Sequence, residues 1–232
     1  MPGRGEAPIL VLAGGKGTRL RTLDASRPKP MVPVQDRPFL HWLIDHCVRS
    51  RATEFILSTG YMAEVVEGYP WARHFPGASF RFHREERALG TGGAVRSVFA
   101  CWPELERIWV LNGDTLLPAP LPEAHPEWDA EYLALEPESL FDAAPNLVVE
   151  DDRVVAERPG GAYFDAGSIL VTRVAVERFR GCDPCSIHEL LAPSMQAGRV
   201  GFRVVPGTCY DIGTPERFAR FEGYLLRSGR AS

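Results

Sequence analysis

Residues 12–34 read LAGGKGTRLRTLDASRPKPMVPV and contain both lysines of the chain, whereas the other 24 of its 26 basic residues are arginines spread along the whole length. A strand that runs into closely spaced glycines leaves the backbone free to approach a ligand and to turn its N–H groups toward an anion. Positive charge comes from Lys16, Arg19 and Lys29. The structural alternative is a glycine turn flanked by basic residues that only contact solvent. That alternative would be preferred if the segment contained Gly-Gly alone, without the other glycine and the basic residues. The segment therefore predicts a loop that holds phosphate groups.

The spacing of the glycines separates this loop from two other phosphate-binding motifs. No Gly-Lys-Ser/Thr follows the glycines, as a Walker loop would require, and the spacing is not that of the dinucleotide fingerprint. A dinucleotide-dependent oxidoreductase would also carry an acidic residue after the second strand, where this chain has Ser58, Thr59 and Gly60. We therefore disfavour a dinucleotide-dependent enzyme.

The composition is that of a single globular enzyme domain. A chain of 232 residues with 45% hydrophobic content can bury a full core around one sheet. The net charge of −4 and the pI near 5.9 disfavour nucleic acid or an anionic membrane as the main partner, because those partners require a broad basic face. Neither an export signal nor an apolar run of about 18 residues is evident. These features predict a cytoplasmic protein.

The five cysteines fit a reducing compartment better than a disulfide framework. Four residues would provide zinc ligands on paper: Cys182, Cys185, His188 and Cys209. A second closely spaced ligand pair is missing, and the neighbouring residues do not resemble a zinc ribbon. We favour a loop with inert thiols over a zinc site.

Short apolar runs alternate with helical patterns through the first half of the chain. Strands are expected at residues 8–13, 54–59, 79–83 and 107–112, and helices at residues 37–51 and 92–102. This alternation predicts a doubly wound α/β sheet that is mixed but mostly parallel, with helices on both faces in three αβα layers. Ligands of such a Rossmann-like sheet bind at the C-terminal ends of its strands, where the glycine loop begins.

The second half of the chain continues the same domain. Residues 116–127 contain four prolines and are interpreted as a loop. Further elements are expected as strands at residues 132–136, 147–150, 153–157, 167–171 and 201–205 and as a helix at residues 186–197. Thr214 and Pro215 have the pattern of an N-cap followed by the first helical position, which predicts a closing helix.

Two aspartates are candidates for holding a magnesium ion. Asp114 follows a buried strand in LNGDT, so its side chain is expected at the same sheet edge as the glycine loop. Magnesium binds phosphate oxygens plus one or two carboxylates and keeps several waters, so it needs little more from the protein. Asp211 in YDIGTP is the candidate second ligand. Taken singly, each aspartate would also fit a turn or a backbone cap.

These motifs together resemble the sugar-1-phosphate nucleotidylyltransferases. The signature of that family is LAGG-x-GTRL followed by PKP-x-x-P-V, and LNGD and DIGTPE stand where its magnesium-binding aspartates occur. The resemblance covers the chain from Ile9 to about Tyr224. It implies a nucleotidyltransferase fold and an enzyme that joins a nucleoside triphosphate to a sugar 1-phosphate with Mg²⁺ and releases pyrophosphate.

The resemblance also implies roles for individual residues. Catalytic roles fall to Arg19, which faces the leaving pyrophosphate, and to Lys29, which bridges the transferring and attacking phosphates. The nucleotide-binding set is Leu12, Ala13, Gly14, Gly15, Lys16, Gly17, Thr18, Glu86, Gly90, Thr91 and Gly92. The last three belong to the LGTGGA segment, which faces the base in the family, and Glu86 is expected to meet the base edge.

Sugar-phosphate binding is assigned to Asn112, Gly113, Glu157, Arg158, Asp165 and Gly167. The last four stand in Glu-Arg-Pro and Asp-Ala-Gly, where the family has Glu-Lys-Pro and Asn-Ala-Gly. Arginine in place of lysine keeps the charge but changes its geometry. Aspartate in place of asparagine removes two donors and adds a charge near an anionic substrate. A surface salt bridge of Glu157 and Arg158 is the structural alternative.

Within the family, LGTGGAV, LNGDT and YDIGTPERF are most similar to the D-glycero-D-manno-heptose 1-phosphate guanylyltransferases. Uridylyltransferases and thymidylyltransferases share the loop and the aspartates, and a catalytically silent regulatory relative is a further alternative. We expect one domain over residues 1–232, with a nucleotide-binding half at 1–115 and a sugar-phosphate-binding half at 116–232. The protein is expected to be a monomer or a homodimer, with Trp71, Phe75 and Trp128 either at an interface or packed beneath loops.

Overall fold

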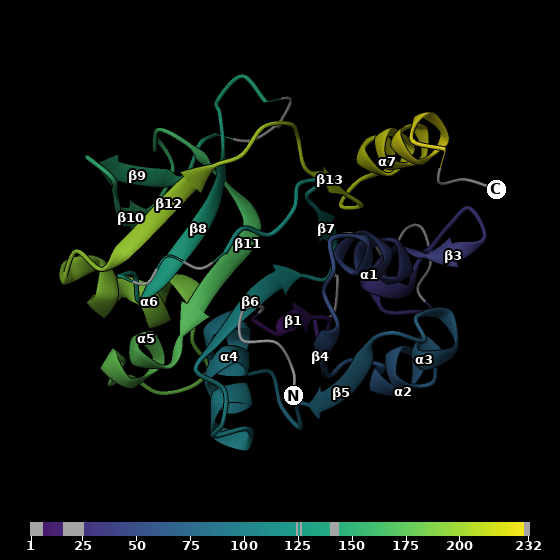
Figure 1. The fold of residues 1–232 in the computed structure, drawn as a ribbon, viewed down its shortest axis with the longest axis horizontal. Helices are drawn as coiled ribbons and strands as arrows, with labels where there is room; N and C mark the ends of the chain where they lie inside the picture. The colour runs from purple at the N-terminus through teal and green to yellow at the C-terminus, as the bar shows by residue number, and fades with distance from the viewer. Residues whose placement is uncertain (1–6, 16–25, 124, 126, 140–143, 230–232) are drawn as a thin grey trace.

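The structure is a computed structural model and describes residues 7–15, 26–123, 125, 127–139 and 144–229. Its centre is one nine-stranded sheet in the order β5-β4-β1-β6-β11-β8-β12-β10-β9 (Figure 1). The strands are β1 (Ile9–Leu12), β4 (Glu54–Thr59), β5 (Ser79–Arg84), β6 (Arg107–Asn112), β8 (Ala130–Leu135), β9 (Leu147–Glu150), β10 (Arg153–Glu157), β11 (Phe164–Thr172) and β12 (Val200–Val204). Seven of the nine point the same way, and only β10 and β11 run against them. The predicted mixed, mostly parallel sheet is confirmed.

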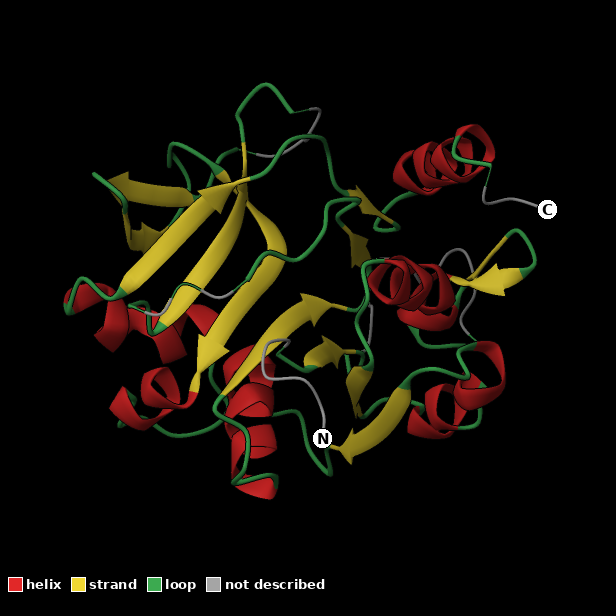
Figure 2. Cartoon of the chain, in the orientation of Figure 1, coloured by secondary structure: helices red, strands yellow, loops and turns green. Residues whose placement is uncertain are grey.

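Helices cover both faces of this sheet (Figure 2). One face carries α1 (Phe39–Arg49), α2 (Ala63–Glu67), α3 (Trp71–His74) and α7 (Pro215–Arg227), and the other carries α4 (Gly90–Cys101), α5 (Arg173–Arg178) and α6 (Ile187–Gln196). Two short ladders lie outside the sheet: β2 (Pro33–Val34) with β3 (Arg37–Pro38), and β7 (Thr115–Leu116) with β13 (Tyr210–Asp211). The predicted three-layer αβα architecture is confirmed.

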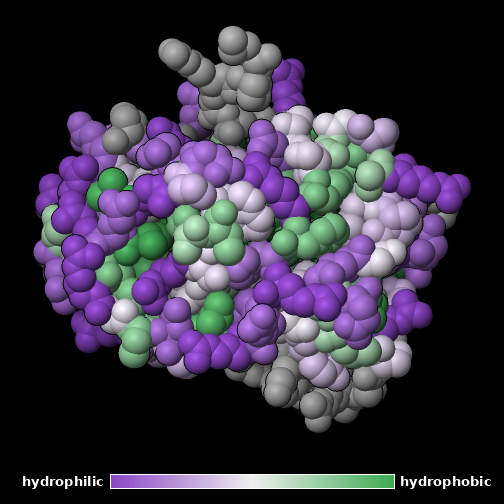
Figure 3. Space-filling view, turned by 90° about the horizontal axis from the view of Figure 1, so that it is seen from below, coloured by the Kyte–Doolittle hydropathy of each residue, from purple (hydrophilic) through white to green (hydrophobic). Residues whose placement is uncertain are grey.

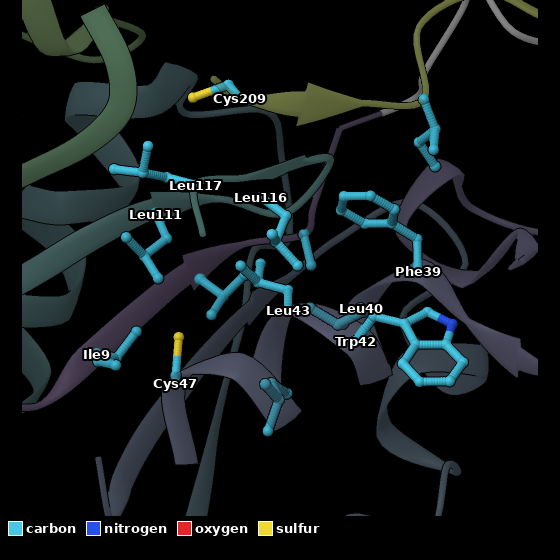
Figure 4. Packing of buried hydrophobic residues seen from close by; sticks show 14 of the residues in the cluster. Ile9, Phe39, Leu40, Trp42, Leu43, Cys47, Leu111, Leu116, Leu117 and Cys209 are labelled. Atoms are coloured by element: carbon cyan, nitrogen blue, oxygen red, sulfur yellow. The ribbon is translucent and has the colours of Figure 1, made fainter. Parts of the chain in front are cut away.

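The core divides into two clusters because successive side chains of a strand point to opposite faces. In β1, Ile9 and Val11 join the cluster under α1, whereas Leu10 joins the cluster under α4. Figure 4 shows side chains of α1, β1 and β6 gathered with Leu116 of β7 in the first cluster. The ring centroids of Phe221 and Phe39 lie 4.8 Å apart, so the closing helix α7 packs against α1 through these two rings.

The order of the strands creates a switch point beside β1. The chain passes from β1 to β4 and β5 on one side and then returns to form β6 on the other side. Leu12 at the end of β1 is level with Ser58 of β4 and with Asn112 of β6. The segments that follow these three strands therefore meet at one edge, which is the usual position of a ligand site in a doubly wound sheet.

Element boundaries differ from the sequence prediction in places that have local causes. The helix predicted from Arg37 begins at Phe39, because Arg37 precedes Pro38 and a residue before proline is held extended. Thr214 is the N-cap of α7 as predicted, and its hydroxyl accepts from the Arg217 N–H. Trp71 and Phe75 are buried in the core, so of the two alternatives they pack within the protein.

On the face drawn in Figure 3, hydrophilic residues predominate and hydrophobic residues form separate patches. None of the helices in the described part of the chain is both long enough and apolar enough to cross a bilayer.

Candidate functional site

A pocket of about 310 Å³ opens at the switch point of the sheet. Nine residues assigned to the site from the sequence line it: Leu12, Gly14, Gly15, Lys29, Gly90, Thr91, Asn112, Gly113 and Asp114. They come from the loop after β1, from the turn before β2, from the start of α4 and from the end of β6. Four segments that are distant in sequence therefore converge on one cavity. Lys16, Gly17, Thr18 and Arg19 lie outside the described residues, and their roles stay predictions.

Two of the lining glycines are required by close backbone approach. A Cβ on Gly113 would lie 2.6 Å from the carbonyl oxygen of Leu12, whereas the Gly113 N–H donates to that oxygen over 3.1 Å. A Cβ on Gly14 would lie 3.1 Å from Glu85 Oε1 and 3.3 Å from the carbonyl carbon of Thr59. These glycines let strand ends β1, β4 and β6 pack together at the floor of the pocket. Ala13 is buried beside them, and its N–H donates to the carbonyl of Ser58.

Lys29 is held over the end of β6 by an ion pair. It begins the short 3₁₀ helix η2 (Lys29–Met31), in which Pro30 is buried. Its Nζ lies 2.6 Å from Oδ2 of Asp114, and the two side chains are 15% and 37% exposed. The Lys29 side chain is thus largely buried, and both partners of the pair line the pocket. A phosphate that enters the pocket meets this charge in a fixed position.

Asp211 comes to the same place through the small ladder of β13 and β7, in which it pairs with Thr115. Its Oδ1 accepts from the Gly213 N–H at 2.7 Å and its Oδ2 from Arg217 at 3.0 Å. The Cβ position of Gly213 lies 2.7 Å from this Oδ1 and 3.7 Å from Lys29 Nζ. Two carboxylates and a lysine thus gather beside the pocket, and hard carboxylate oxygens fit a divalent cation that also binds phosphate.

The glycines at the start of α4 serve packing as well as the pocket. Gly92 and Gly93 are buried, and both of their N–H groups donate to the carbonyl of Cys185. A Cβ on Gly92 would lie 2.3 Å from the Ser186 carbonyl oxygen, and a Cβ on Gly90 would lie 2.3 Å from that of Cys185. Gly90 and Thr91 line the pocket, whereas Gly92 faces the loop before α6 and is not among the lining residues.

Besides Asp114, the pocket is lined by the acidic residue Glu85, one position before Glu86, whose predicted contact with the base stays a prediction. Glu86 is exposed and is not among the lining residues. Glu85 Oε1 accepts from Ser58 Oγ at 2.9 Å, and Oε2 accepts from the Leu89 N–H at 3.2 Å. Since β5 ends at Arg84, Glu85 is the first residue beyond the sheet edge and turns into the pocket. The sequence pattern alone did not distinguish these two adjacent glutamates.

The sugar-side residues form a second polar group next to Asn112. The Cβ position of Gly167, where φ is +72°, lies 3.0 Å from Asn112 Nδ2. Glu157 accepts from Asn146 Nδ2 at 3.2 Å and from the Tyr132 hydroxyl at 3.3 Å, and His188 Nδ1 lies 3.9 Å from it. Asn146 and Tyr132 were not among the site residues predicted from the sequence, and His188 was considered there only as a zinc ligand. The side chain of Arg158 is exposed and does not line the pocket.

Asp165 stands within this polar group, and its ionisation is suppressed. Asn146 Oδ1 accepts from its backbone N–H, and its own Oδ1 accepts from the Gly167 N–H. Burial and the neighbouring charge of Glu157 raise the pKa of Asp165 from 3.8 to about 7. A carboxyl group that keeps its proton near neutral pH donates a hydrogen bond. Asp165 thereby regains part of the donor function that an asparagine would have there.

Replacing Asp165 with asparagine is expected to stabilise the protein more at pH 7 than at pH 4. A carboxyl group whose pKa is raised by folding binds more protons in the folded state, so its contribution to stability falls as pH rises from about 4 to about 7. The gain at pH 7 is on the order of 1–2 kcal/mol once partial solvent screening is allowed for. Urea unfolding of both proteins at several pH values measures it. A difference that is flat with pH would contradict the assignment.

The candidate zinc ligands do not assemble into a site. Among the residues that the structure describes, no group of three or more histidine, cysteine, aspartate or glutamate side chains is placed to hold a metal ion. Cys185 and Cys209 are buried free thiols, and the Cys209 Sγ donates to the carbonyl of Ala166 at 3.3 Å. Burial raises the pKa of the Cys209 thiol, which agrees with the expectation of inert thiols.

Comparison with known proteins agrees with this geometry. The family model described as nucleotidyl transferase matches residues 9–131. The chain belongs to the nucleotidyl transferase family. The D-glycero-alpha-D-manno-heptose 1-phosphate guanylyltransferase of Aneurinibacillus thermoaerophilus is 36% identical over 164 residues, which cover 69% of this chain and 70% of that protein. The enzyme of the same name from Campylobacter jejuni is 28% identical over 219 residues, or 91% and 97% of the two chains.

Solved structures of other proteins share the fold. HddC from Yersinia pseudotuberculosis superposes with a TM-score of 0.80 at 23% identity, covering 95% of this chain and 100% of that one. UDP-glucose pyrophosphorylase from Acinetobacter baumannii gives a TM-score of 0.75 at 17% identity, covering 95% and 93%. The chain is a sugar-1-phosphate nucleotidyltransferase, and members of the family generally use a divalent metal ion.

Proposed function

We propose that this enzyme transfers GMP from GTP to D-glycero-D-manno-heptose 1-phosphate and releases pyrophosphate. The observation that carries the choice of base is Glu85, whose carboxylate is anchored by Ser58 and Leu89 in the wall of the pocket. Two relatives with this activity support the sugar, and HddC was solved in complex with GMP-PN, a guanosine nucleotide. Residues 1–115 would then supply most of the nucleotide site and residues 116–232 the sugar-phosphate site.

A carboxylate accepts hydrogen bonds and does not donate them, which makes Glu85 selective among bases. Guanine alone presents two adjacent donors, N1–H and the exocyclic amino group, on its pairing edge. Uracil and thymine present a single N–H between two carbonyl oxygens, which a carboxylate repels. Adenine and cytosine present a ring acceptor at the corresponding position. A fixed carboxylate therefore favours guanine and disfavours the other bases.

In the proposed reaction an oxygen of the sugar phosphate attacks the α-phosphorus of GTP in line. The new bond joins this oxygen to the α-phosphorus, and the bond from the α-phosphorus to the bridging oxygen breaks as pyrophosphate leaves. No general base is needed, because the attacking phosphate is already anionic. Lys29 supplies positive charge beside the transferring phosphate, whereas the orienting role of Arg158 stays a prediction, because its exposed side chain does not line the pocket.

Asp114 and Asp211 are the residues that would hold a divalent cation, for which we propose Mg²⁺. When bound, the cation would neutralise charge on the triphosphate oxygens. The side chains on the sugar side have roles that do not involve the cation. Glu157, hydrogen-bonded by Asn146 and Tyr132, has acceptor capacity left for sugar hydroxyls, and Asp165 offers either a donor or an acceptor.

A second sugar is supported by one further relative. The mannose-1-phosphate guanylyltransferase of Mycobacterium tuberculosis is 30% identical over 237 residues, covering 96% of this chain and 65% of that longer protein. Mannose 1-phosphate is therefore the alternative substrate to test first, ahead of the glucose and N-acetylmuramate phosphates of the uridylyl- and thymidylyltransferases.

Pyrophosphate release from GTP, UTP, dTTP, ATP and CTP against these sugar 1-phosphates tests the proposal, with Mg²⁺ and with a chelator. Magnesium-dependent release from GTP and the heptose phosphate is expected. Release that is fastest with UTP or dTTP would replace the proposal by the corresponding transferase. Nucleotide binding without any release would favour a silent regulatory relative.

The substitution Glu85→Gln tests the role of Glu85 in base selection with the same assay. The variant is expected to lower kcat/KM for GTP by roughly 10- to 100-fold, because the glutamine amide replaces an acceptor with a donor. The ratio of GTP to ITP turnover should fall with it, because ITP lacks the exocyclic amino group. Glu86→Gln is the matched control, since this neighbour is exposed. Equal losses in both variants would remove Glu85 from base selection.

A further inference from the structure

A second pocket, of about 490 Å³, lies on the side of the molecule that carries α1 and α2. Its walls include Arg27, Met31, Asp36, Arg37, Val65 and Tyr69. Figure 1 shows β3 and the short helices α2 and α3 at this end of the molecule. A cavity of this size is in the range that holds a small metabolite. The proposed reaction makes no use of it.

The turn that carries Lys29 contributes to both pockets. Lys29 and Pro30 line the catalytic pocket, whereas Met31 and Arg27 line the second one. The 3₁₀ helix η2 is only three residues long, and the Met31 N–H donates to the carbonyl of Pro28. Met31 and Lys29 are therefore separated by Pro30 alone, within a short segment that proline stiffens.

Buried His41 fixes a hydrogen-bond chain beneath the second pocket. The Arg37 guanidinium lies 2.8 Å from His41 Nε2, and Tyr69 Oη lies 2.9 Å from His41 Nδ1. A guanidinium only donates, so Nε2 is the acceptor, and the neutral imidazole carries its hydrogen on Nδ1. Burial and the charge of Arg37 lower the pKa of His41 to about 4, which keeps the ring neutral. His41 then donates to the Tyr69 oxygen.

This direction of donation determines what Tyr69 offers to a ligand. Its oxygen already accepts from His41, so its own O–H hydrogen is left to donate in another direction, and Tyr69 is part of the pocket wall. Arg37 is held in place by His41, by Asp36 at 3.6 Å and by the Trp42 ring at 5.7 Å. Tyr69, the oriented Arg37 and the apolar Val65 thus belong to the wall of one pocket.

We propose that this second pocket binds the phosphate group of a small phosphorylated metabolite between Tyr69 and Arg37, and that its occupancy shifts Lys29 through the turn at Met31. Oriented donors with one cationic member match a phosphate better than a neutral group. Asp36 and Glu64, also in the wall, suit hydroxyl groups on the rest of the ligand. The binding part is independent of the proposed function, whereas the effect on turnover rests on Lys29 acting there.

Calorimetric titration with glucose 6-phosphate and with inorganic phosphate tests the binding, in the presence of a saturating guanosine nucleotide that fills the catalytic pocket. Tyr69→Phe retains the ring and removes only the donor, so it is expected to weaken binding by roughly tenfold. Tyr163→Phe is the control, since Tyr163 lines neither pocket. Binding of neither probe, or equal affinity in Tyr69→Phe and the wild type, would overturn the proposed site.

Turnover measured with and without glucose 6-phosphate tests the coupling. A change of roughly fivefold or more is expected in the wild type and a smaller one in Tyr69→Phe. Lys29→Ala should still bind the probe with unchanged affinity although its turnover is low, which separates failure of the second site from failure of the proposed reaction. Binding that leaves wild-type turnover unchanged would overturn the coupling.

Discussion

Replacing Lys29 with alanine is expected to lower kcat by about 10²- to 10³-fold, because a preorganised cation is removed from the place where phosphate charge develops. The Lys29 side chain is 15% exposed, and its Nζ lies 2.6 Å from Oδ2 of Asp114. No other described residue that lines the catalytic pocket is cationic. Steady-state pyrophosphate release with both substrates saturating measures the effect.

The fold should tolerate this substitution. Asp114 is 37% exposed and also accepts from Thr115 Oγ1, so loss of the ion pair costs about 1 kcal/mol of stability. Lys29→Arg is the matched variant, since it keeps the positive charge but replaces the compact ammonium group by a planar guanidinium group. We expect it to recover part of kcat. An alanine variant with wild-type kcat would remove Lys29 from catalysis.

The catalytic edge of the sheet could be predicted because its signals are local. A glycine loop directly after an apolar strand, and an aspartate directly after another, must meet where parallel strands end together. Gly14 and Asp114 were assigned in this way, Leu12 and Asn112 were assigned through the family resemblance, and all four line one pocket. The alternation of strands and helices likewise gave the layers of the fold.

Contacts between distant segments could not be predicted from these patterns. Buried strands of either direction have similar apolar sequences, so β11 gave no sign that it lies antiparallel between β6 and β8. Helices α2 and α3 have five and four residues, too few to show a helical period. Asn146 reaches Glu157 only because β9 and β10 form a hairpin that folds it back. The distinction between Glu85 and Glu86 also depended on where β5 ends.

The LGTGGA segment illustrates how one motif can carry two requirements. Gly90 and Thr91 were predicted to lie at the nucleotide site because the segment resembles a base-facing segment, and both residues line the pocket. Gly92 and Gly93 are glycines for a different reason, because the loop before α6 packs closely against them. Ile187 N–H donates to Thr91 Oγ1 at 2.8 Å, and Arg96 pairs with Asp183 at 2.6 Å. The start of α4 and the start of α6 are therefore one packed unit, and the shape of the pocket wall depends on it.

Gly92→Ala is accordingly expected to destabilise the protein by about 2–4 kcal/mol. In an open helix the same change would stabilise by up to about 1 kcal/mol, because alanine has the higher helix propensity. Here the new Cβ would lie 2.3 Å from the Ser186 carbonyl oxygen and 2.8 Å from its carbon, so backbone must move. For a chain of this length the loss corresponds to a fall in Tm of roughly 5–15 °C, which thermal unfolding measures.

The control for this prediction is Gly77→Ala, because no heavy atom lies within 4 Å of a Cβ at that position. Its Tm should stay close to that of the wild type. Movement at Gly92 would also separate α4 from the loop at Cys185, whose carbonyl accepts from both Gly92 and Gly93. Since Thr91 lies in the pocket wall, KM for the nucleotide should rise in Gly92→Ala even at temperatures where the variant is folded. A raised Tm would mean that the loop at Ser186 can move away from the new Cβ without loss of stability. An unchanged KM would mean that the packing of α4 against this loop does not determine the shape of the pocket.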